Sequence, residues 1–103
     1  MKDELDFSGI AGVNKLIHEP ARVSIMTLLS VIEEADFIFV MNRTGLTQGN
    51  LSSHLARLEK AGLVNIEKTF KGKRPHTLLR LSKKGEKELT AYMTSMKTFI
   101  NRF

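Results

Sequence analysis

Apolar residues in the first half of the chain recur at the spacing of amphipathic helices. One stripe follows Pro20 at positions i, i+3, i+4 and i+7: Ile25, Leu28, Leu29 and Ile32. Pro20 marks the expected helix start, because proline is well tolerated in the first turn. Val23 and Met26 lie off this stripe, which predicts a helix buried on two sides. A shorter helix is predicted before it by the same spacing of Ile10, Val13, Leu16 and Ile17.

The middle of the chain predicts two helices joined by a tight turn. The first is a short apolar segment from Phe37 to Arg43, which ends at Thr44-Gly45, where glycine suits the left-handed position after a helix. Thr47 is a good N-cap for the second helix, which ends at Gly62. Its inner stripe consists of Leu51, Leu55 and Leu58. The pair forms a helix-turn-helix unit.

After Gly62 the apolar period changes from that of a helix to that of a strand. Alternating residues on the two sides of a basic turn predict a β-hairpin with a five-residue tip over residues 71–75. The alternating residues are Val64, Ile66 and Phe70, then Thr77, Leu79 and Leu81. Ser82 then caps a final helix. The predicted fold is mainly α with a small β-hairpin, within one domain over residues 1–103.

Charge divides the chain into an acidic start and a basic end. The whole chain has 16 Lys and Arg against 11 Asp and Glu, a net charge of +5. Residues 1–36 hold three basic and seven acidic residues, whereas residues 68–103 hold ten and two. Such a basic surface favours a polyanion as partner, although a solvated lysine surface is the alternative.

Several classes of protein are disfavoured by what the chain lacks. It has no cysteine, and its three histidines have no ligand spacing, so no metal and no cofactor are expected. No catalytic constellation is present, so an enzyme is not expected. The apolar runs are far shorter than the roughly 20 residues that cross a bilayer. The acidic N-terminus does not resemble a secretory signal, and we therefore expect a cytoplasmic protein without a membrane partner.

The order of these segments resembles the one-domain winged-helix regulators of the MarR/ArsR superfamily. The resemblance lies in residues 18–22, in 46–55 across the second helix of the motif, in 58–64, and in 70–77 and 81–85 around the hairpin, or wing. It implies a dimeric transcription factor that places the second helix of the motif in the major groove. Larger MarR proteins carry an Asp-x-Arg wing motif and extra helices that form an effector pocket. This chain lacks both, so we do not expect a small-molecule effector.

The residues expected to contact DNA lie on the helix that begins at Thr47 and on the wing. Gln and Asn can pair with adenine, and small side chains allow close approach to base edges. Alternatively, these residues only cap and solvate the start of a helix. Basic wing residues suit phosphates or the minor groove. The candidates are Thr47, Gln48, Gly49, Asn50, Ser52, Ser53, His54 and Arg57 on the helix, and Lys68, Lys71, Lys73, Arg74 and His76 on the wing.

The final helix, expected over residues 83–103, predicts a homodimer. A helix of 20 residues is about 30 Å long, more than a small domain can cover. Alternatively, its second half frays. The residues expected at the interface are Ile10, Val13, Leu16, Leu89, Tyr92, Met93, Met96, Phe99, Ile100 and Phe103. The function expected from the sequence is therefore sequence-specific binding of double-stranded DNA by a homodimeric regulator. The alternative is a winged-helix interaction module that docks an acidic partner.

Overall fold

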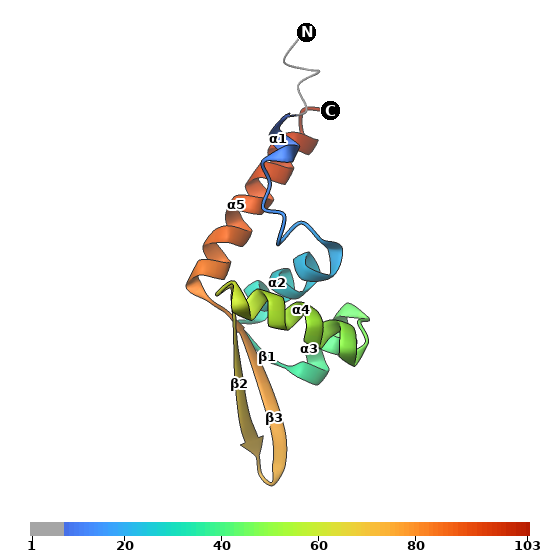
Figure 1. The fold of residues 1–103 in the computed structure, drawn as a ribbon, viewed down its shortest axis with the longest axis vertical. Coiled ribbons are helices and arrows are strands. Elements are labelled where there is room, and N and C mark those ends of the chain that lie inside the picture. The colour runs from blue at the N-terminus through green and yellow to red at the C-terminus, as the bar shows by residue number, and fades with distance from the viewer. Residues whose placement is uncertain (1–7) are drawn as a thin grey trace.

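The computed structural model describes residues 8–103, which form five helices and three strands (Figure 1). The elements are α1 (Ser8–Ala11), α2 (Pro20–Ile32), β1 (Glu34–Asp36), α3 (Phe37–Thr44), α4 (Gln48–Lys60), β2 (Val64–Lys71), β3 (Arg74–Leu81) and α5 (Lys83–Ile100). The predicted class, mainly α with a small β-hairpin, is confirmed. The molecule is elongated, with the β2–β3 hairpin at one end and the C-terminal half of α5 at the other.

The predicted starts of three helices are confirmed by their caps. α2 begins at Pro20, and the carboxylate of Glu19 accepts hydrogen bonds from two backbone N–H groups of its first turn. Thr47 and Ser82 cap α4 and α5, where each hydroxyl accepts the N–H three residues further on, at 3.2 and 2.9 Å. These bonds satisfy donors that a helix start otherwise leaves without a partner.

The predicted helix-turn-helix unit consists of α3 and α4. Gly45 follows α3 with a φ of +72°, the left-handed conformation that glycine adopts without a steric penalty. Asp36 caps the start of α3, and its carboxylate accepts the N–H of Phe39 at 2.8 Å. This turn was predicted from Thr44-Gly45 and is confirmed.

The predicted hairpin is present, but its predicted five-residue tip is wrong. β2 and β3 pair antiparallel as far as Lys71 opposite Arg74, so only Gly72 and Lys73 form the turn. Gly72 has a φ of +65°, as two-residue hairpin turns require at their first central position. β3 can include Pro75 because β1 pairs only with residues 78–80, which leaves an open strand edge at the proline.

The sequence did not predict β1, whose residues Glu34–Asp36 pair antiparallel with β3. The sheet order is therefore β1-β3-β2, with the strand that follows the wing turn in the middle. α2 ends at Ile32, and its C-cap residue Glu33 has a φ of +61°, which helps the chain turn into β1.

The helix predicted over Ile10 to Ile17 is largely wrong. α1 ends at Ala11, and Asn14 then accepts hydrogen bonds through its side-chain oxygen from the N–H groups of Leu16 and Ile17, at 2.9 and 3.2 Å. An asparagine side chain that takes the place of a helical acceptor stabilises a turn instead. Ile17 is nevertheless fully buried, so the apolar pattern correctly indicated burial here.

The core lies where α2 and α4 pack against each other and on the sheet, with α2 also packed on α5. Its most deeply buried side chains are Ile17, Ile25, Met26, Leu29, Val40, Leu51, Leu55, Leu58, Leu63, Val64 and Leu79. The predicted two-sided burial of α2 is confirmed by Met26, which is fully buried off the main stripe. No helix within residues 8–103 is long and apolar enough to cross a membrane.

Candidate nucleic-acid interface

Helix α4 presents a small, polar face to solvent. Its inner stripe, Leu51, Leu55 and Leu58, is buried as predicted and fixes the rotation of the helix about its axis. On α4 and its N-cap, the predicted contact residues that are exposed are Thr47, Gln48, Gly49, Asn50, Ser52, Ser53 and Arg57. None of them carries an aromatic ring. The Thr47 hydroxyl accepts the N–H of Asn50, so its oxygen already serves the helix cap.

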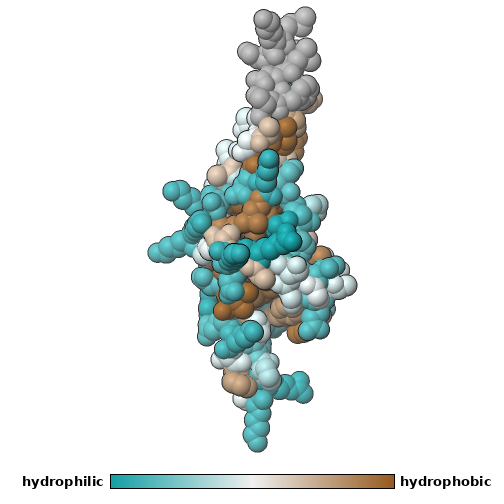
Figure 2. All heavy atoms as spheres, in the orientation of Figure 1, coloured by the Kyte–Doolittle hydropathy of each residue, from teal (hydrophilic) through white to brown (hydrophobic). Residues whose placement is uncertain are grey.

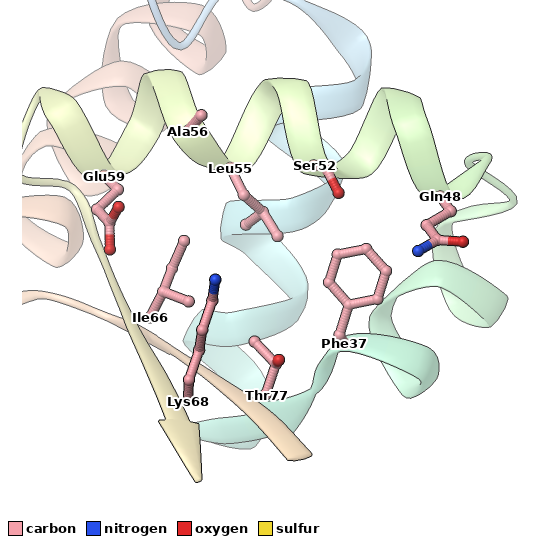
Figure 3. Close-up of a pocket in the computed structure, with 9 residues that line it drawn as sticks. All are labelled: Phe37, Gln48, Ser52, Leu55, Ala56, Glu59, Ile66, Lys68 and Thr77. Carbon is pink, nitrogen blue, oxygen red and sulfur yellow. The ribbon is translucent and has the colours of Figure 1, made fainter. Parts of the chain in front are cut away.

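An open pocket of about 580 Å³ separates α4 from the wing (Figure 3). Ser52 and Gln48 project from α4 toward this pocket, and Lys68 extends into it from β2. Leu55 and Ile66 give it an apolar floor. The pocket is lined by Phe37, Gln48, Ser52, Leu55, Ala56, Glu59, Ile66, Lys68 and Thr77. The structure thus brings together predicted residues from the helix and from the wing on one surface.

Six of the nine residues that line this pocket were not among the predicted contacts: Phe37, Leu55, Ala56, Glu59, Ile66 and Thr77. Thr77 lies directly opposite Lys68 in the hairpin register, so the alternation of β2 and β3 was a usable signal for its position. Phe37 is the first residue of α3, and its ring closes the end of the pocket. No local pattern of the sequence indicated that the start of α3 meets the wing.

The wing carries its positive charge on both faces and at its tip. Lys68 lies on the face toward α4, together with Ile66 and Thr77. Because side chains alternate along a strand, Lys71, Arg74 and His76 lie on the opposite face. Lys71, Lys73 and Arg74 are exposed, whereas His76 is half-buried. The predicted wing residues therefore lie at the end of one hairpin but do not share one face.

An ionic cluster joins the three strands at the base of the wing. Arg80 on β3 donates hydrogen bonds to Glu34 on β1 at 2.7 Å and to Glu67 on β2 at 3.0 Å. These hydrogen bonds to Glu67 and Glu34 raise the pKa of Arg80 above its usual range, which favours the charged guanidinium that arginine already carries at physiological pH. The cluster lies on the wing face away from α4 and fixes β1 against the hairpin.

The side chain of His54 is not grouped with the exposed face of α4. It is half-buried, and its Nδ1 lies 3.6 Å from Oε2 of Glu19, the residue that caps α2. Burial opposes ionisation of Glu19, but the N–H groups of Ala21 and Arg22 and the electrostatic interactions with His54 and Arg22 outweigh it. Together they hold the pKa of the Glu19 carboxyl below its usual range. His54 thus links α4 to α2, and a contact to DNA stays a prediction for it.

The apolar stripe of α5 extends beyond the core. Val13, Leu89 and Tyr92 are more than nine-tenths buried by the chain itself, so they support the helix from within and add no exposed area to an interface. The other predicted interface residues are less covered. Ile10, Leu16, Met93, Met96 and Phe99 are half-buried, whereas Ile100 and Phe103 are 61% and 66% exposed. α1 packs against α5 near this end (Figure 1).

Within residues 8–103, no three His, Asp or Glu side chains lie close enough together to hold a metal ion. His18 instead shares a hydrogen bond with Tyr92, with 2.8 Å between Nδ1 and the phenol oxygen. His54 faces Glu19, and His76 lies on the wing. The three histidines therefore lie in separate parts of the fold, with His18 in the connection before α2.

Comparison with known proteins agrees with this geometry. Residues 21–100 match the family of winged helix DNA-binding domains. An uncharacterised protein of Methanocaldococcus jannaschii is 32% identical over 79 residues, which cover 77% of this chain and 86% of that protein. The structure of a transcriptional regulator homologue from Pyrococcus horikoshii superposes with a TM-score of 0.79 at 29% identity, covering 97% of this chain and 92% of the other.

More distant structures share the fold. The transcriptional regulator PcaV of Streptomyces coelicolor, solved with its natural ligand, has a TM-score of 0.74 at 20% identity, covering 87% of this chain and 62% of its own. A MarR-family regulator of Silicibacter pomeroyi has a TM-score of 0.67 at 21% identity, covering 84% and 57%. At these identities the likeness shows the fold alone.

Proposed function

Because the chain belongs to the family of winged helix DNA-binding domains, we propose that it is a homodimeric transcriptional regulator that recognises specific double-stranded DNA. The observation that carries this proposal is the shared surface of α4 and the wing. The polar face of α4 and the cationic side chain of Lys68 border one open pocket. Such a surface suits a DNA duplex. α4 would lie in the major groove, and the phosphate backbone of the DNA would run along the pocket between α4 and the wing.

In this proposal α4 is the recognition helix and reads base edges in the major groove. Its first turn approaches the groove floor, so Gln48 and Asn50 are placed to hydrogen-bond adenine, and Ser52 and Ser53 to bond either base of a pair. Gly49 adds no side chain that would hold the helix away from the bases. Arg57 lies about one helical turn after Ser53 on α4, where its guanidinium is suited to contact a phosphate.

The wing supplies affinity rather than sequence information. Lys73 and Arg74 at its tip, with Lys71 beside them, are exposed cations at the far end of the hairpin from the core. Neutralising phosphates releases counterions from the duplex, which favours binding at low salt. Lys68 adds a positive charge on the wing face toward α4. His76 adds a polar side chain that can contact DNA on the other face.

Dimerisation through residues 83–103 completes the proposal. The stripe of α5 leaves Ile100 mostly exposed, and Met93 and Met96 half-buried, in addition to Leu89 and Tyr92, which are more than nine-tenths buried. Apolar surface of this kind marks an interface. A two-fold axis between two α5 helices would present two recognition helices to a pseudo-palindromic site. Residues 1–103 then form one domain per subunit, with α1 beside α5 at the interface. The ligand of the PcaV structure belongs to that protein, and we propose no effector here.

An interaction module that docks an acidic protein is the alternative. Such a module would be expected to expose aromatic side chains on the corresponding helix, and α4 exposes none. Electrophoretic mobility shifts on fragmented genomic DNA at about 50 mM salt test the proposal. We expect a retarded complex that resists competition by polyglutamate and dissociates as salt rises, with a slope near −0.9 in log K for each phosphate contacted. No complex at that salt would contradict the proposal.

A further inference from the structure

A large aromatic side chain lies in solvent near the end of the wing. Phe70, the next-to-last residue of β2, is 71% exposed. It is flanked by cations, with Lys71 next in sequence and Arg74 opposite that residue across the hairpin. Figure 2 shows a small apolar patch near the end of the wing, surrounded by hydrophilic residues. An isolated exposed phenylalanine is unremarkable by itself, so its position decides what it can do.

Phe70 lies on the wing face that is turned toward α4. Strand alternation places it with Ile66 and Lys68, both of which line the pocket beside the helix. Its cross-strand partner is Pro75. The face toward α4 therefore begins in the core, continues through the Lys68–Thr77 pair, and ends in an apolar pair. The opposite face of the same hairpin end carries Lys71 and Arg74.

The fold of the chain does not account for an apolar pair at this place. β1 pairs with β3 only through residues 78–80, so the sheet has two strands at Phe70 and Pro75. The Phe70 ring does not pack on the core, because Lys68 lies between it and Ile66 on this face of β2. If the end of the hairpin only had to face solvent, polar residues would suit these two positions better than Phe70 and Pro75. The pair therefore suits a partner that offers both apolar and anionic surface.

We propose that Phe70 and Pro75 form an apolar wedge that enters the minor groove of the bound duplex. This inference rests on the proposed DNA binding and names a part of it. The minor groove has walls of deoxyribose, which are apolar, between two rows of phosphates, which pair with cations. Apolar side chains such as phenylalanine and proline open base steps there and bend the duplex toward the major groove. The exposed Lys71, Lys73 and Arg74 match the phosphates on either side.

Charge selects DNA over a second copy of this chain as the occupant. Two wing ends in contact would bring six exposed cations together, three from each copy. A bend toward the major groove, by contrast, would wrap the duplex around the face of the molecule that carries α4. The wedge and the recognition helix lie on the same side of the wing, so both can engage one duplex.

Binding of F70A, measured by fluorescence anisotropy across a salt series, tests the wedge. We expect F70A to lose affinity by about tenfold, equivalent to about 1.4 kcal/mol, at every salt concentration. The slope of log K against log[salt] should not change, because the lost contact carries no charge. The matched control is V31A, since Val31 is 74% exposed and lies on α2, which does not line the pocket beside the wing. V31A should bind as the wild type does.

Two further measurements keep the result interpretable. Energy transfer between dyes at the ends of the duplex should report a bend of roughly 20–90° with the wild type and a smaller bend with F70A. The chain has no tryptophan, so F70W places a single reporter at the wedge, and its emission should change when the complex forms. Circular dichroism of both variants checks that the fold is retained.

The possible failures are distinguishable. If the wild type binds no duplex, both the proposed function and the wedge are wrong. If the wild type binds DNA and F70A binds equally well, or F70W emission stays constant while the complex forms, the wedge alone is wrong. A loss in F70A that appears only as a changed salt slope would also contradict it.

Discussion

Oε2 of Glu19 lies 3.6 Å from Nδ1 of His54, so the side chain that caps α2 also faces α4. The same carboxylate accepts the N–H groups of Ala21 and Arg22 at 3.1 and 3.0 Å. One residue thus fixes the start of α2 and contacts α4. The angle between these two helices positions the surface of α4 that we propose to contact DNA, and Glu19 is therefore a structural support of the proposed site.

The stability of the protein should depend on pH through Glu19. Its pKa is lowered in the folded chain, so the carboxylate stabilises the fold above about pH 4.3, the ordinary value in an unfolded chain. This contribution is lost as pH falls through the lower folded value. E19Q should therefore be about 1 kcal/mol less stable than the wild type at pH 7, and the difference should shrink at pH 3. Urea unfolding at both values measures it. E59Q is the control, because Glu59 is exposed and caps no helix; an E19Q deficit equal at both pH values would contradict the prediction.

Two glycine-to-alanine changes should have opposite effects on stability. A Cβ atom at Gly85 would overlap the backbone carbonyl oxygen of Leu63, whereas nothing lies within 4 Å of one at Gly49. G85A should cost about 1–3 kcal/mol through overpacking. G49A should gain up to about 1 kcal/mol, because alanine is the better helix former. Denaturant unfolding without DNA gives both values. Equal midpoints for G85A and the wild type would show that α5 does not approach Leu63 this closely.

Wing and recognition-helix variants should affect binding in different ways. Replacing Lys73 and Arg74 with alanine should weaken binding to all duplexes alike and flatten the salt slope, since phosphate contacts carry little sequence information. Replacing Gln48 or Ser53 should lower the ratio of specific to random binding by about 1–3 kcal/mol for a lost base contact. Parallel titrations of a selected site and random DNA separate the two. Similar losses on both duplexes from both sets of variants would refute this division of roles.

The exposed end of α5 should hold the dimer together. Burying a large apolar side chain is worth roughly 1.5–3 kcal/mol, so changing Met96 and Phe99 to lysine should give a folded monomer with weaker binding to the full site. Sedimentation velocity at micromolar concentration should show the wild type at twice the monomer mass of 11.6 kDa. V31K, which places a lysine on the exposed surface of α2 instead, should remain dimeric. A wild-type monomer that still binds a half-site tightly would refute the dimer while leaving DNA binding intact.

Local signals in the sequence predicted most of the helices and their ends. Pro20, Thr47 and Ser82 mark helix starts through interactions within one turn, and all three are confirmed. The rotation of α4, and hence its exposed face, followed from the spacing of its three buried leucines. The polar residues proposed to contact bases were therefore found without knowledge of the tertiary structure.

Features that depend on distant contacts or on competing local bonds were not predicted. β1 is only Glu34–Asp36, has no strand-forming composition, and exists because β3 pairs with it 46 residues away, at Glu34 and Arg80. Asn14 ended the first predicted helix through its own side chain. The basic composition around Pro75 suggested a loop, but the open edge of β3 there allows the strand to continue. The pocket wall formed by Phe37 depends on the same tertiary packing.

Footprinting of the complex on a selected site tests the central claim most directly. Methylation of guanine N7 reports occupancy of the major groove, and hydroxyl-radical cleavage reports coverage of the sugars along the minor groove. We predict two major-groove protections separated by one helical turn, about 10–10.5 base pairs, or a multiple of it. Minor-groove protection by the wings should lie beside them and disappear when the wing tip is replaced. A complex that protects the minor groove alone, or leaves guanine N7 fully reactive throughout the site, would contradict the assignment of α4 as the recognition helix.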